Sequence, residues 1–328
     1  EHDDLFSLMY IYNNAGMINS YRGDYKTSLD LYRKSLDLAL KLGIKRHEGI
    51  IFGNLAATYF YKGDYHKALE YCLKGIDNAK LLGDEVNQCH LISTIGVIYR
   101  KLGQPDKSLE CFEKQKELAK KMNAMNLYSI AIGNIAFMFT LTGEFEKSNE
   151  MYEEAVQLST RTDDKISMAV NYSNMADNYK YLKDYSRSLE LFKKSIKICE
   201  EHDLKFHLVS VYCYISEVYA EMKKIEEALS YSEKCRDIAL ELDRKDFLLK
   251  CDLAKTLLDN SKPSAERVKF LLSLDKDSLS EEEKASLYKA VYKISGSKEF
   301  KKKALTLYTG LYKKLKYYDY RIAMEELS

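Results

Sequence analysis

Apolar residues recur along most of the chain in a pattern that repeats every 40 residues. In one copy of this pattern, the first apolar series is Phe52, Leu55, Ala56 and Tyr59. Steps of three, one and three residues place these side chains on one face of a helix. After a short turn comes a second helical series, which consists of Tyr65, Ala68, Leu69, Cys72 and Ile76. Each copy therefore predicts two helices joined by a turn.

The turn Gly63-Asp64-Tyr65 marks the repeat most clearly. Its counterparts, each 40 residues from the next copy, are Gly23-Asp24-Tyr25, Gly103-Gln104-Pro105, Gly143-Glu144-Phe145, Lys183-Asp184-Tyr185 and Lys223-Lys224-Ile225. The second helix of a copy runs to a residue such as Gly43, Gly83 or Asp203, which suits a helix end. Six copies in phase, without an insertion, indicate stacked helix pairs rather than one closed globule.

The first helix of every copy has a small residue at the centre of its apolar face. These residues are Gly16, Ala56, Gly96, Ala136, Ala176 and Ser216. Two helices need small side chains where their backbones approach closely. We therefore predict an all-α fold, a right-handed superhelical solenoid of antiparallel helix pairs, with six repeats in residues 1–244.

Beyond residue 244 the pattern weakens. The residues from Lys245 onward read as one helix, Pro263 precedes a second, and Ser280 with Glu283 forms a capping box that opens a third. A further segment, Ala304 to Tyr308, repeats the motif of the second helix. For residues 245–328 we predict degenerate repeats and a C-terminal helical cap.

The succession of small residue, aromatic residue, glycine turn and Ala68-Leu69 resembles the tetratricopeptide repeat over roughly residues 5 to 245. The 40-residue period and Asn54-Leu55-Ala56 look most like one variant of it. That variant occurs in the Leu-Gly-Asn repeats of spindle-orientation adaptors, in kinesin light chains and in bacterial peptide-responsive regulators. The resemblance implies a concave surface, lined by the first helices, that binds peptides. The sixth turn departs from the pattern because it has lost its glycine.

Composition narrows the choice of partners. Lysine and arginine number 51 against 50 aspartates and glutamates, a net charge of +1, so the chain lacks the basic excess of a general nucleic-acid binder. The seven cysteines include no Cys-x-x-Cys pair, which is typical of proteins in a reducing compartment. We expect the cysteines to be core residues and the protein to be cytoplasmic.

One uncharged stretch, Met122 to Gly143, is long enough to cross a bilayer. It contains Asn123, Asn126 and Asn134, and it falls in register with the first helix of the other copies. We therefore interpret it as an apolar copy of that helix and predict no membrane span.

The sequence contains none of the common catalytic motifs. There is no glycine-rich phosphate loop, no His-Glu-x-x-His and no Gly-x-Ser-x-Gly, and the six histidines share no ligand spacing. We predict no catalytic residue, no metal site and no cofactor.

Four asparagines occupy one equivalent position of the first helices: Asn14, Asn54, Asn134 and Asn174. They stand two residues before the small residue, about 200° round the helix from it, so they should face away from the second helix. By the resemblance, this face is the concave surface, where a carboxamide can bind a peptide backbone. The alternative is that these asparagines hold neighbouring repeats together. The sequence leaves both interpretations open.

Aromatic and basic residues follow the asparagines on the same face. The candidates for partner binding are Tyr21, Tyr61, Tyr181, Arg100 and Lys180. Tyrosine combines apolar area with a hydroxyl group and suits recognition, although it can equally pack against the next repeat. Basic residues are missing where some tetratricopeptide domains grip a C-terminal carboxylate, since Asn13, Gly53, Ser93 and Gly133 stand there.

The predicted function is a non-catalytic protein-protein interaction module that binds a peptide or a partner segment in its concave groove. One alternative is a sensory domain of a larger bacterial signalling protein, such as a kinase, a cyclase or a transcription regulator, that responds to a peptide or protein ligand. A third is an enzyme within the C-terminal helices. The same groove serves the first two functions, so the sequence does not separate them. It predicts neither the partner's identity nor the oligomeric state.

Overall fold

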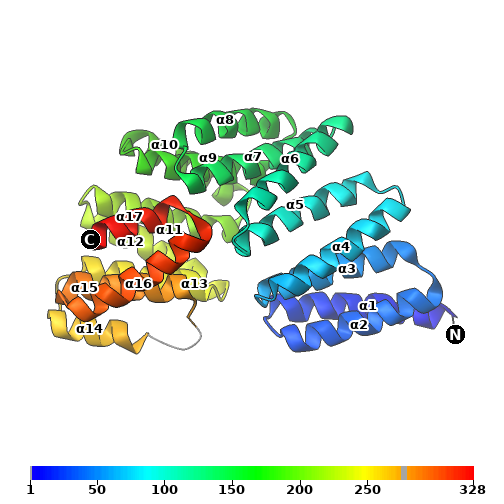
Figure 1. Cartoon of the computed structure of the whole chain (residues 1–328), viewed down its shortest axis with the longest axis horizontal. Coiled ribbons are helices and arrows are strands. Elements are labelled where there is room, and N and C mark those ends of the chain that lie inside the picture. The colour runs from blue at the N-terminus through cyan, green and yellow to red at the C-terminus, as the bar shows by residue number, and fades with distance from the viewer. Residues whose placement is uncertain (1, 275–278) are drawn as a thin grey trace. The chain divides into compact units, whose positions relative to one another are not determined.

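A computed structural model describes residues 2–274 and 279–328, without the side chains of residues 2, 3 and 21. These residues form seventeen helices and no strand (Figure 1). The chain divides into two compact units, residues 1–131 and 132–328. In both units the helices pack as antiparallel pairs joined by short turns, which confirms the all-α fold of stacked helix pairs. The predicted division at residue 244 stays a prediction.

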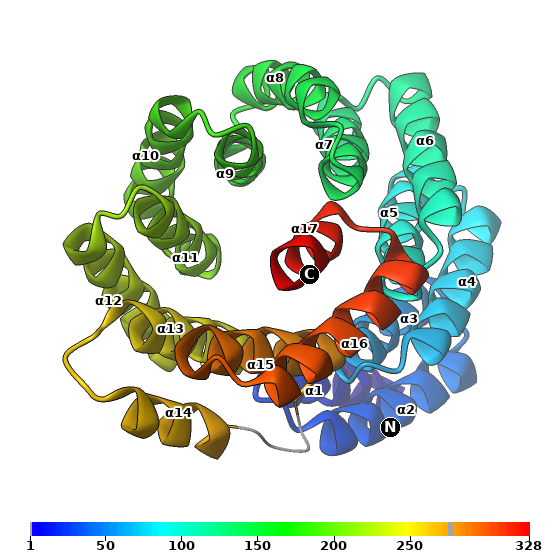
Figure 2. The same cartoon turned by 60° about the vertical axis from the view of Figure 1, so that its left-hand side comes forward.

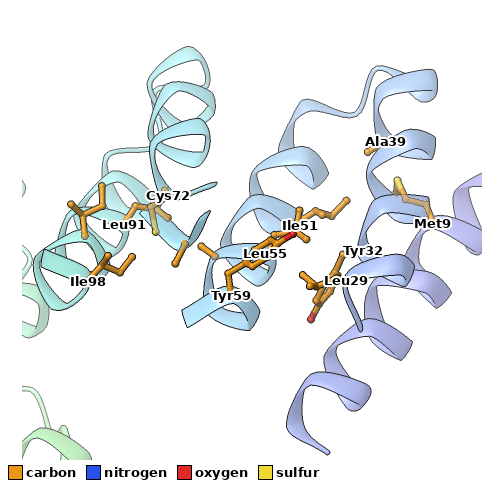
Figure 3. Packing of buried hydrophobic residues seen from close by; sticks show 13 residues of the cluster. Met9, Leu29, Tyr32, Ala39, Ile51, Leu55, Tyr59, Cys72, Leu91 and Ile98 are labelled. Atoms are coloured by element: carbon orange, nitrogen blue, oxygen red, sulfur yellow. The ribbon is translucent and has the colours of Figure 1, made fainter. Parts of the chain in front are cut away.

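The first unit consists of three helix pairs and the start of α7 (Met125–Thr142). The helices are α1 (His2–Tyr21), α2 (Tyr25–Leu42), α3 (Lys45–Tyr61), α4 (Tyr65–Leu81), α5 (Glu85–Lys101) and α6 (Pro105–Lys121). Its main core joins α1 to α5 and includes Met9, Tyr32, Leu55 and Ile98, all fully or almost fully buried (Figure 3). Each pair thus covers the apolar face of the next pair.

Aspartate and glycine explain the turn between the helices of a pair. Gly63 adopts a positive φ of 84°, which costs glycine little, and Asp64 then caps α4 by accepting a hydrogen bond from the backbone N–H of Lys67. Lys183 and Lys223, which replace the glycine, keep the left-handed conformation, each with φ of 61°. The backbone of the repeat is therefore preserved where its usual residue is lost.

The small residues of the first helices lie where the two helices of a pair touch. A Cβ atom on Gly16 would stand 2.9 Å from the ring of Tyr32, and one on Gly96 would stand 2.5 Å from the ring of Phe112. Both aromatic rings are buried. The predicted close approach of the two helices is confirmed at these positions.

The second unit contains the rest of the chain. Its helices are α8 (Phe145–Arg161), α9 (Lys165–Tyr181), α10 (Tyr185–Glu201), α11 (Lys205–Glu221), α12 (Ile225–Glu241), α13 (Lys245–Leu258), α14 (Ser264–Ser273), α15 (Glu281–Ser295), α16 (Lys298–Leu315) and α17 (Tyr318–Leu327). The expected capping box opens α15, because Ser280 and Glu283 exchange both hydrogen bonds. Tyr320, Ala323 and Leu327 of α17 are buried in a cluster with α15 and α16.

The last helix turns inward within this unit. Figure 2 shows α17 on the inner side of the curve that α9, α11 and α13 describe. Its first residues reach the turn before α8 and the end of α9, because Tyr318 contacts Gly143, Phe145 and Tyr181. A terminal segment therefore becomes part of the concave side of the second unit.

Helix α7 (Met125–Thr142) corresponds to the apolar stretch. Among the described helices it alone is long and apolar enough to span a bilayer by length and composition, with a mean hydropathy of 1.3 and 44% of its residues buried. Leu127 packs with Cys89 and Ala119 in the first unit, and Ala136 packs with Tyr152 in the second. Both ends of α7 thus take part in repeat cores, as the register of the stretch predicts.

Candidate functional site

A cavity of about 590 Å³ lies on the inner side of the second unit. The ends of α9 and α11 and the length of α13 form one wall, and residues of α15 and α17 form the other. Apolar side chains such as Leu253, Ala254 and Leu257 line it together with charged and tyrosyl side chains. A mixed lining of this kind and size is typical of sites that bind a small ligand or part of a peptide.

Lys180 is the most tightly held charged residue of the cavity. Its side chain is only 6% exposed, and its Nζ lies 2.7 Å from the Asp177 carboxylate and 3.0 Å from that of Glu217. Burial disfavours the charge, but the two carboxylates keep the pKa of the ammonium well above its ordinary value. Burial likewise opposes the charge on Glu217, yet Lys180 and Lys250 hold its pKa below the usual value. The three groups form a network linking α9 to α11.

Lys250, on α13, lines the same cavity. Its Nζ stands over the rings of Tyr214 and Phe247, at 5.6 Å and 5.5 Å from their centres. These are contacts of the cation–π type. The inner wall therefore offers aromatic and cationic groups together.

An aromatic cluster closes one end of the cavity. The rings of Phe145 and Tyr181 stack at 5.0 Å with an angle of 6°. Tyr318 meets both rings edge to face, at 4.9 Å and 5.5 Å. Asp319, the residue after Tyr318, also lines the cavity. Its side chain is still exposed to water, but other protein atoms enclose it on several sides. This enclosure raises the pKa of Asp319, although the Tyr181 hydroxyl and Lys180 favour its charged form.

The four asparagines of the ladder do not share one environment. Asn14 is exposed, while the other three are half-buried. Asn54 donates a hydrogen bond of 2.9 Å to the side chain of Asn13 on the preceding first helix, which is the contact that the structural interpretation expects. Asn174 lies close to the hydroxyl of Tyr152. None of the four lines the cavity, so their role in partner binding stays a prediction.

The other predicted residues fall into two groups. Lys180 and Tyr181 line the cavity, where they contact α11 and α17. In the first unit, Tyr61 is 64% exposed at the end of α3 and Arg100 is half-buried near the end of α5. The side chain of Tyr21 lies outside the described residues. The structure thus brings two of the nine candidates to one site.

Sequence reasoning missed a buried network around Asn178, four residues after Asn174. The amide of Asn178 donates to Ser148 and Asn149 at 2.9 Å and 2.8 Å, and its oxygen accepts from Thr140 at 2.9 Å. Asn178 is completely buried, so its role is to join α9 to α7 and α8. Because no other copy has asparagine at this position, the repeat pattern carries no signal for it.

Tyr318 and Asp319 were missed for a different reason. They belong to a part of the chain without a repeat pattern, and no local rule places the last helix against α9. Among the described residues there is also no group of three or more His, Cys, Asp or Glu side chains that could hold a metal ion.

Comparison with protein families gives matches over much of the chain. Two family models, both described as tetratricopeptide repeat, match it: one over residues 7–80 and 125–201, the other over residues 91–122. No curated protein sequence matches the chain significantly.

Solved structures match over almost the whole chain. A Rap protein complexed with competence and sporulation factor has a TM-score of 0.70 and 16% identity, with 99% of this chain and 88% of that chain covered. NprR in complex with its cognate peptide NprX gives 0.67 and 17%, with 92% and 86% covered. Aspartyl phosphate phosphatase F from Bacillus subtilis gives 0.60 and 18%, with 90% and 75% covered. At these identities the similarity shows a shared fold.

Proposed function

Because the chain belongs to the tetratricopeptide repeat family, we propose that it is a non-catalytic interaction module that binds a peptide segment in the cavity of its second unit. The cavity on the inner side of α9, α11 and α13 is the observation that carries this proposal. Its volume of about 590 Å³ admits a few residues of a peptide rather than a folded partner.

The lining of the cavity suits a peptide better than a purely apolar ligand. Tyrosines such as Tyr181 and Tyr308 combine a flat apolar surface with a hydroxyl group, and Lys250 and Glu282 offer groups of opposite charge. A peptide presents the complementary mixture of side chains, N–H and carbonyl groups. Among the similar structures, a Rap protein is named as a complex with competence and sporulation factor and NprR as a complex with its cognate peptide, which supports the same class of ligand here.

The comparisons also favour the sensory form of this function. The NprR structure is named for a complex with its cognate peptide, and another NprR structure is named as that of a quorum sensor. In a sensor the bound peptide shifts the population of two conformations of the repeat stack. The two forms of the proposal share the cavity and differ in whether binding changes the helix packing.

A titration with synthetic peptides tests the proposal. The full chain is screened against a library of random heptapeptides, and the dissociation constant of each selected peptide is measured by calorimetry. Ala254→Trp fills the cavity with a large side chain and should weaken binding at least tenfold. Leu73→Trp, on the exposed outer surface of α4, adds the same side chain elsewhere and should leave binding unchanged. Thermal melting of both variants verifies folding.

Two results contradict the proposal. One is a library from which no peptide binds the folded chain. The other is a set of peptides that bind the Ala254→Trp variant as tightly as the unmodified chain, since these would occupy a different surface. A phosphatase assay on the same preparation tests the non-catalytic part, because one similar structure bears the name of a phosphatase.

A further inference from the structure

The exposed side of α1 carries large apolar residues. Ile11 is 60% exposed and Ile18 is 48% exposed, on a helix that lies at the end of the first stack (Figure 1). Phe6, Tyr10 and Met17, which are exposed as well, follow on the adjoining strip of the helix surface. The terminal repeat of a stack usually presents a polar outer face, because an apolar one promotes association. The sequence of α1 departs from this rule.

The later copies of the repeat show how this face is used. The residues that correspond to Ile11 in the later first helices are all buried: Ile51, Leu91, Ala131, Asn171, Val211 and Cys251. The residues that correspond to Ile18 in the next five copies are buried too: Thr58, Ile98, Met138, Asn178 and Val218. Among the described residues, Ile11 and Ile18 alone are exposed at these two positions. The face is therefore a packing surface in the later copies and is uncovered in the first.

In the later copies the face receives the preceding helix pair. The hydroxyl of Thr58 lies 3.0 Å from that of Ser20 on α1. Ile51 belongs to the same buried cluster as Leu29 and Tyr32 of α2. Because a short turn joins α2 to α3, the second helix that covers this face runs antiparallel to the first helix beneath it. The face is thus shaped to receive an antiparallel helix.

The face of α1 is complementary to itself in the antiparallel direction. Along the helix, steps of three, four, three and four residues separate Asp4, Ser7, Ile11, Asn14 and Ile18, which is the spacing of a coiled-coil seam. In an antiparallel pair of α1 helices, Ile11 of one copy meets Ile18 of the other. The two Asn14 side chains then lie beside the twofold axis, where carboxamides can donate to and accept from each other.

The two ends of α1 carry opposite charges. Asp4 is exposed in the first turn, and Arg22, directly after the last residue of the helix, is exposed as well. An antiparallel pair brings Arg22 of each copy near Asp4 of the other, whereas a parallel pair would place like charges together. The dipoles of two antiparallel helices also attract each other. Charge therefore favours the same arrangement as the spacing of the apolar residues.

From these observations we propose that α1 is a dimerisation surface, on which a second copy of this chain packs its own α1 in antiparallel orientation across a twofold axis. The same face is used by both copies, so the assembly closes at two chains. The second α1 takes the place that a preceding second helix occupies in the later copies. No residue of α1 lines the cavity of the second unit, so the interface leaves the proposed peptide site of each copy in place.

Sedimentation equilibrium of the full chain, between about 1 and 300 μM, tests the proposal, because a contact of one helix per copy should give a dissociation constant in the micromolar range. Ile11→Asp should raise this constant at least about tenfold, since the twofold axis places the substitution in the interface twice. Ile50→Asp is the matched control, because Ile50 is as exposed as Ile18 but lies on α3, outside the face. Thermal melting verifies that both variants fold.

Exchanging the charges tests the orientation of the two helices. Arg22→Asp and Asp4→Arg should each weaken the dimer, because each places like charges opposite one another. The double variant exchanges the two charges and should restore the dissociation constant of the unmodified chain to within about threefold. Asn14→Lys should also dissociate the dimer, because the twofold axis brings two ammonium groups together. Copies that associate head to tail would not bring these groups together.

A chain that stays monomeric up to about 300 μM overturns the inference, since the face of α1 would then be covered by something other than a second copy. Species that keep growing with concentration also overturn it, because they indicate head-to-tail association. A dimer that Ile11→Asp leaves intact refutes the interface on α1. If the single charge variants weaken the dimer and the double variant does not recover it, the antiparallel arrangement is wrong.

Discussion

At the scale of single residues, some polar side chains on the first helices are buried and join neighbouring helices through hydrogen bonds, whereas others remain partly accessible to water. Asn178 is inaccessible and makes three hydrogen bonds, whereas Asn174 on the next turn is half-buried. A buried polar group without its partners costs far more than one that water can reach. Replacing these two asparagines of α9 by alanine should therefore change the free energy of unfolding by different amounts.

Asn178→Ala should lower the free energy of unfolding by about 3 kcal/mol, because Thr140, Ser148 and Asn149 each lose a buried partner. Asn174→Ala should lower it by less than about 1 kcal/mol. Urea denaturation midpoints of the two variants give the comparison. Equal losses would show that the two positions have the same structural role.

The raised pKa of Asp319 predicts that the stability of the folded chain depends on pH. Its enclosure raises its pKa in the folded chain above the value of about 3.9 for an unfolded chain. Tyr181 and Lys180 favour its charge, while Glu217 and Glu282 oppose it. The folded chain thus holds this carboxylate less favourably than the unfolded chain does. This penalty is present above the folded pKa and disappears below the unfolded pKa.

Asp319→Asn should therefore melt at a higher temperature than the unmodified chain at pH 7. The difference should shrink as the pH falls through the folded pKa and vanish near pH 3. Glu325→Gln, on the exposed face of the same helix, controls for the change from carboxylate to amide. A difference in melting temperature that is constant between pH 7 and pH 3 would contradict the assignment.

At the scale of elements, the helix ends are set by left-handed residues more than by glycine itself. Gly63 and Lys223 occupy equivalent turns and both have positive φ, of 84° and 61°. For a residue with a Cβ atom this conformation costs roughly 1 kcal/mol. The chain accepts that cost at the fifth and sixth turns because the stacking of the flanking helices holds the turn.

Lys223→Gly should raise the free energy of unfolding by about 0.5 kcal/mol, since the relief of strain exceeds the added flexibility of the unfolded chain. Gly63→Ala should lower it by about 1 kcal/mol through the backbone alone, because no atom lies within 4 Å of the added Cβ. Thermal melting measures both. Opposite signs are expected, and a loss for both variants would refute this account.

The attachment of α17 depends on a few buried side chains. Leu327 is 1% exposed, and its truncation to alanine should cost about 2 kcal/mol, within the range for a buried leucine. Hydrogen exchange of α17 should accelerate while that of α9 to α12 stays unchanged. Met324→Ala, at a half-buried position of α17, is the matched control. Unchanged exchange of α17 in the Leu327 variant would contradict the proposed anchor.

At the scale of the whole molecule, each unit is a stack in which apolar side chains are shared between neighbouring pairs. The burial of the cysteines reflects this packing: six of the seven are buried, and Cys111 is half-buried. Burial raises the pKa of Cys72 to about 12 and that of Cys199 to about 11. A thiol must be both exposed and ionised to react with a disulfide reagent.

We therefore expect Cys111 to react with a thiol reagent in the native chain before cysteines of the repeat cores such as Cys72 and Cys199, which should react only when the stack opens. Mass spectrometry after timed labelling at pH 8 identifies the modified residues. The same reaction in guanidinium chloride gives the rate for accessible thiols. Rapid native labelling of Cys72 or Cys199 would show that the core around it is not closed.

The sequence by itself determined the helices, their pairing and the close contacts within each pair. These features depend on residues within one copy: the spacing of Leu55 and Tyr59, the capping Asp64 and the small residue at Gly16. Their physical causes are local, since helix periodicity, end capping and backbone approach each involve residues only a few turns apart in the chain. Repetition strengthened the prediction because the same helical spacing recurs from copy to copy.

Only the tertiary structure decided how the candidate site is built. Lys180 and Tyr181 were identified from their repeat position, but that position does not say which residues cover them. Tyr318 reaches Gly143 and Phe145 because the packing of α17 on α16 aims its first turn at the end of α9. Contacts between segments so far apart in the chain depend on the accumulated geometry of every helix between them, and no local pattern of residues encodes that sum.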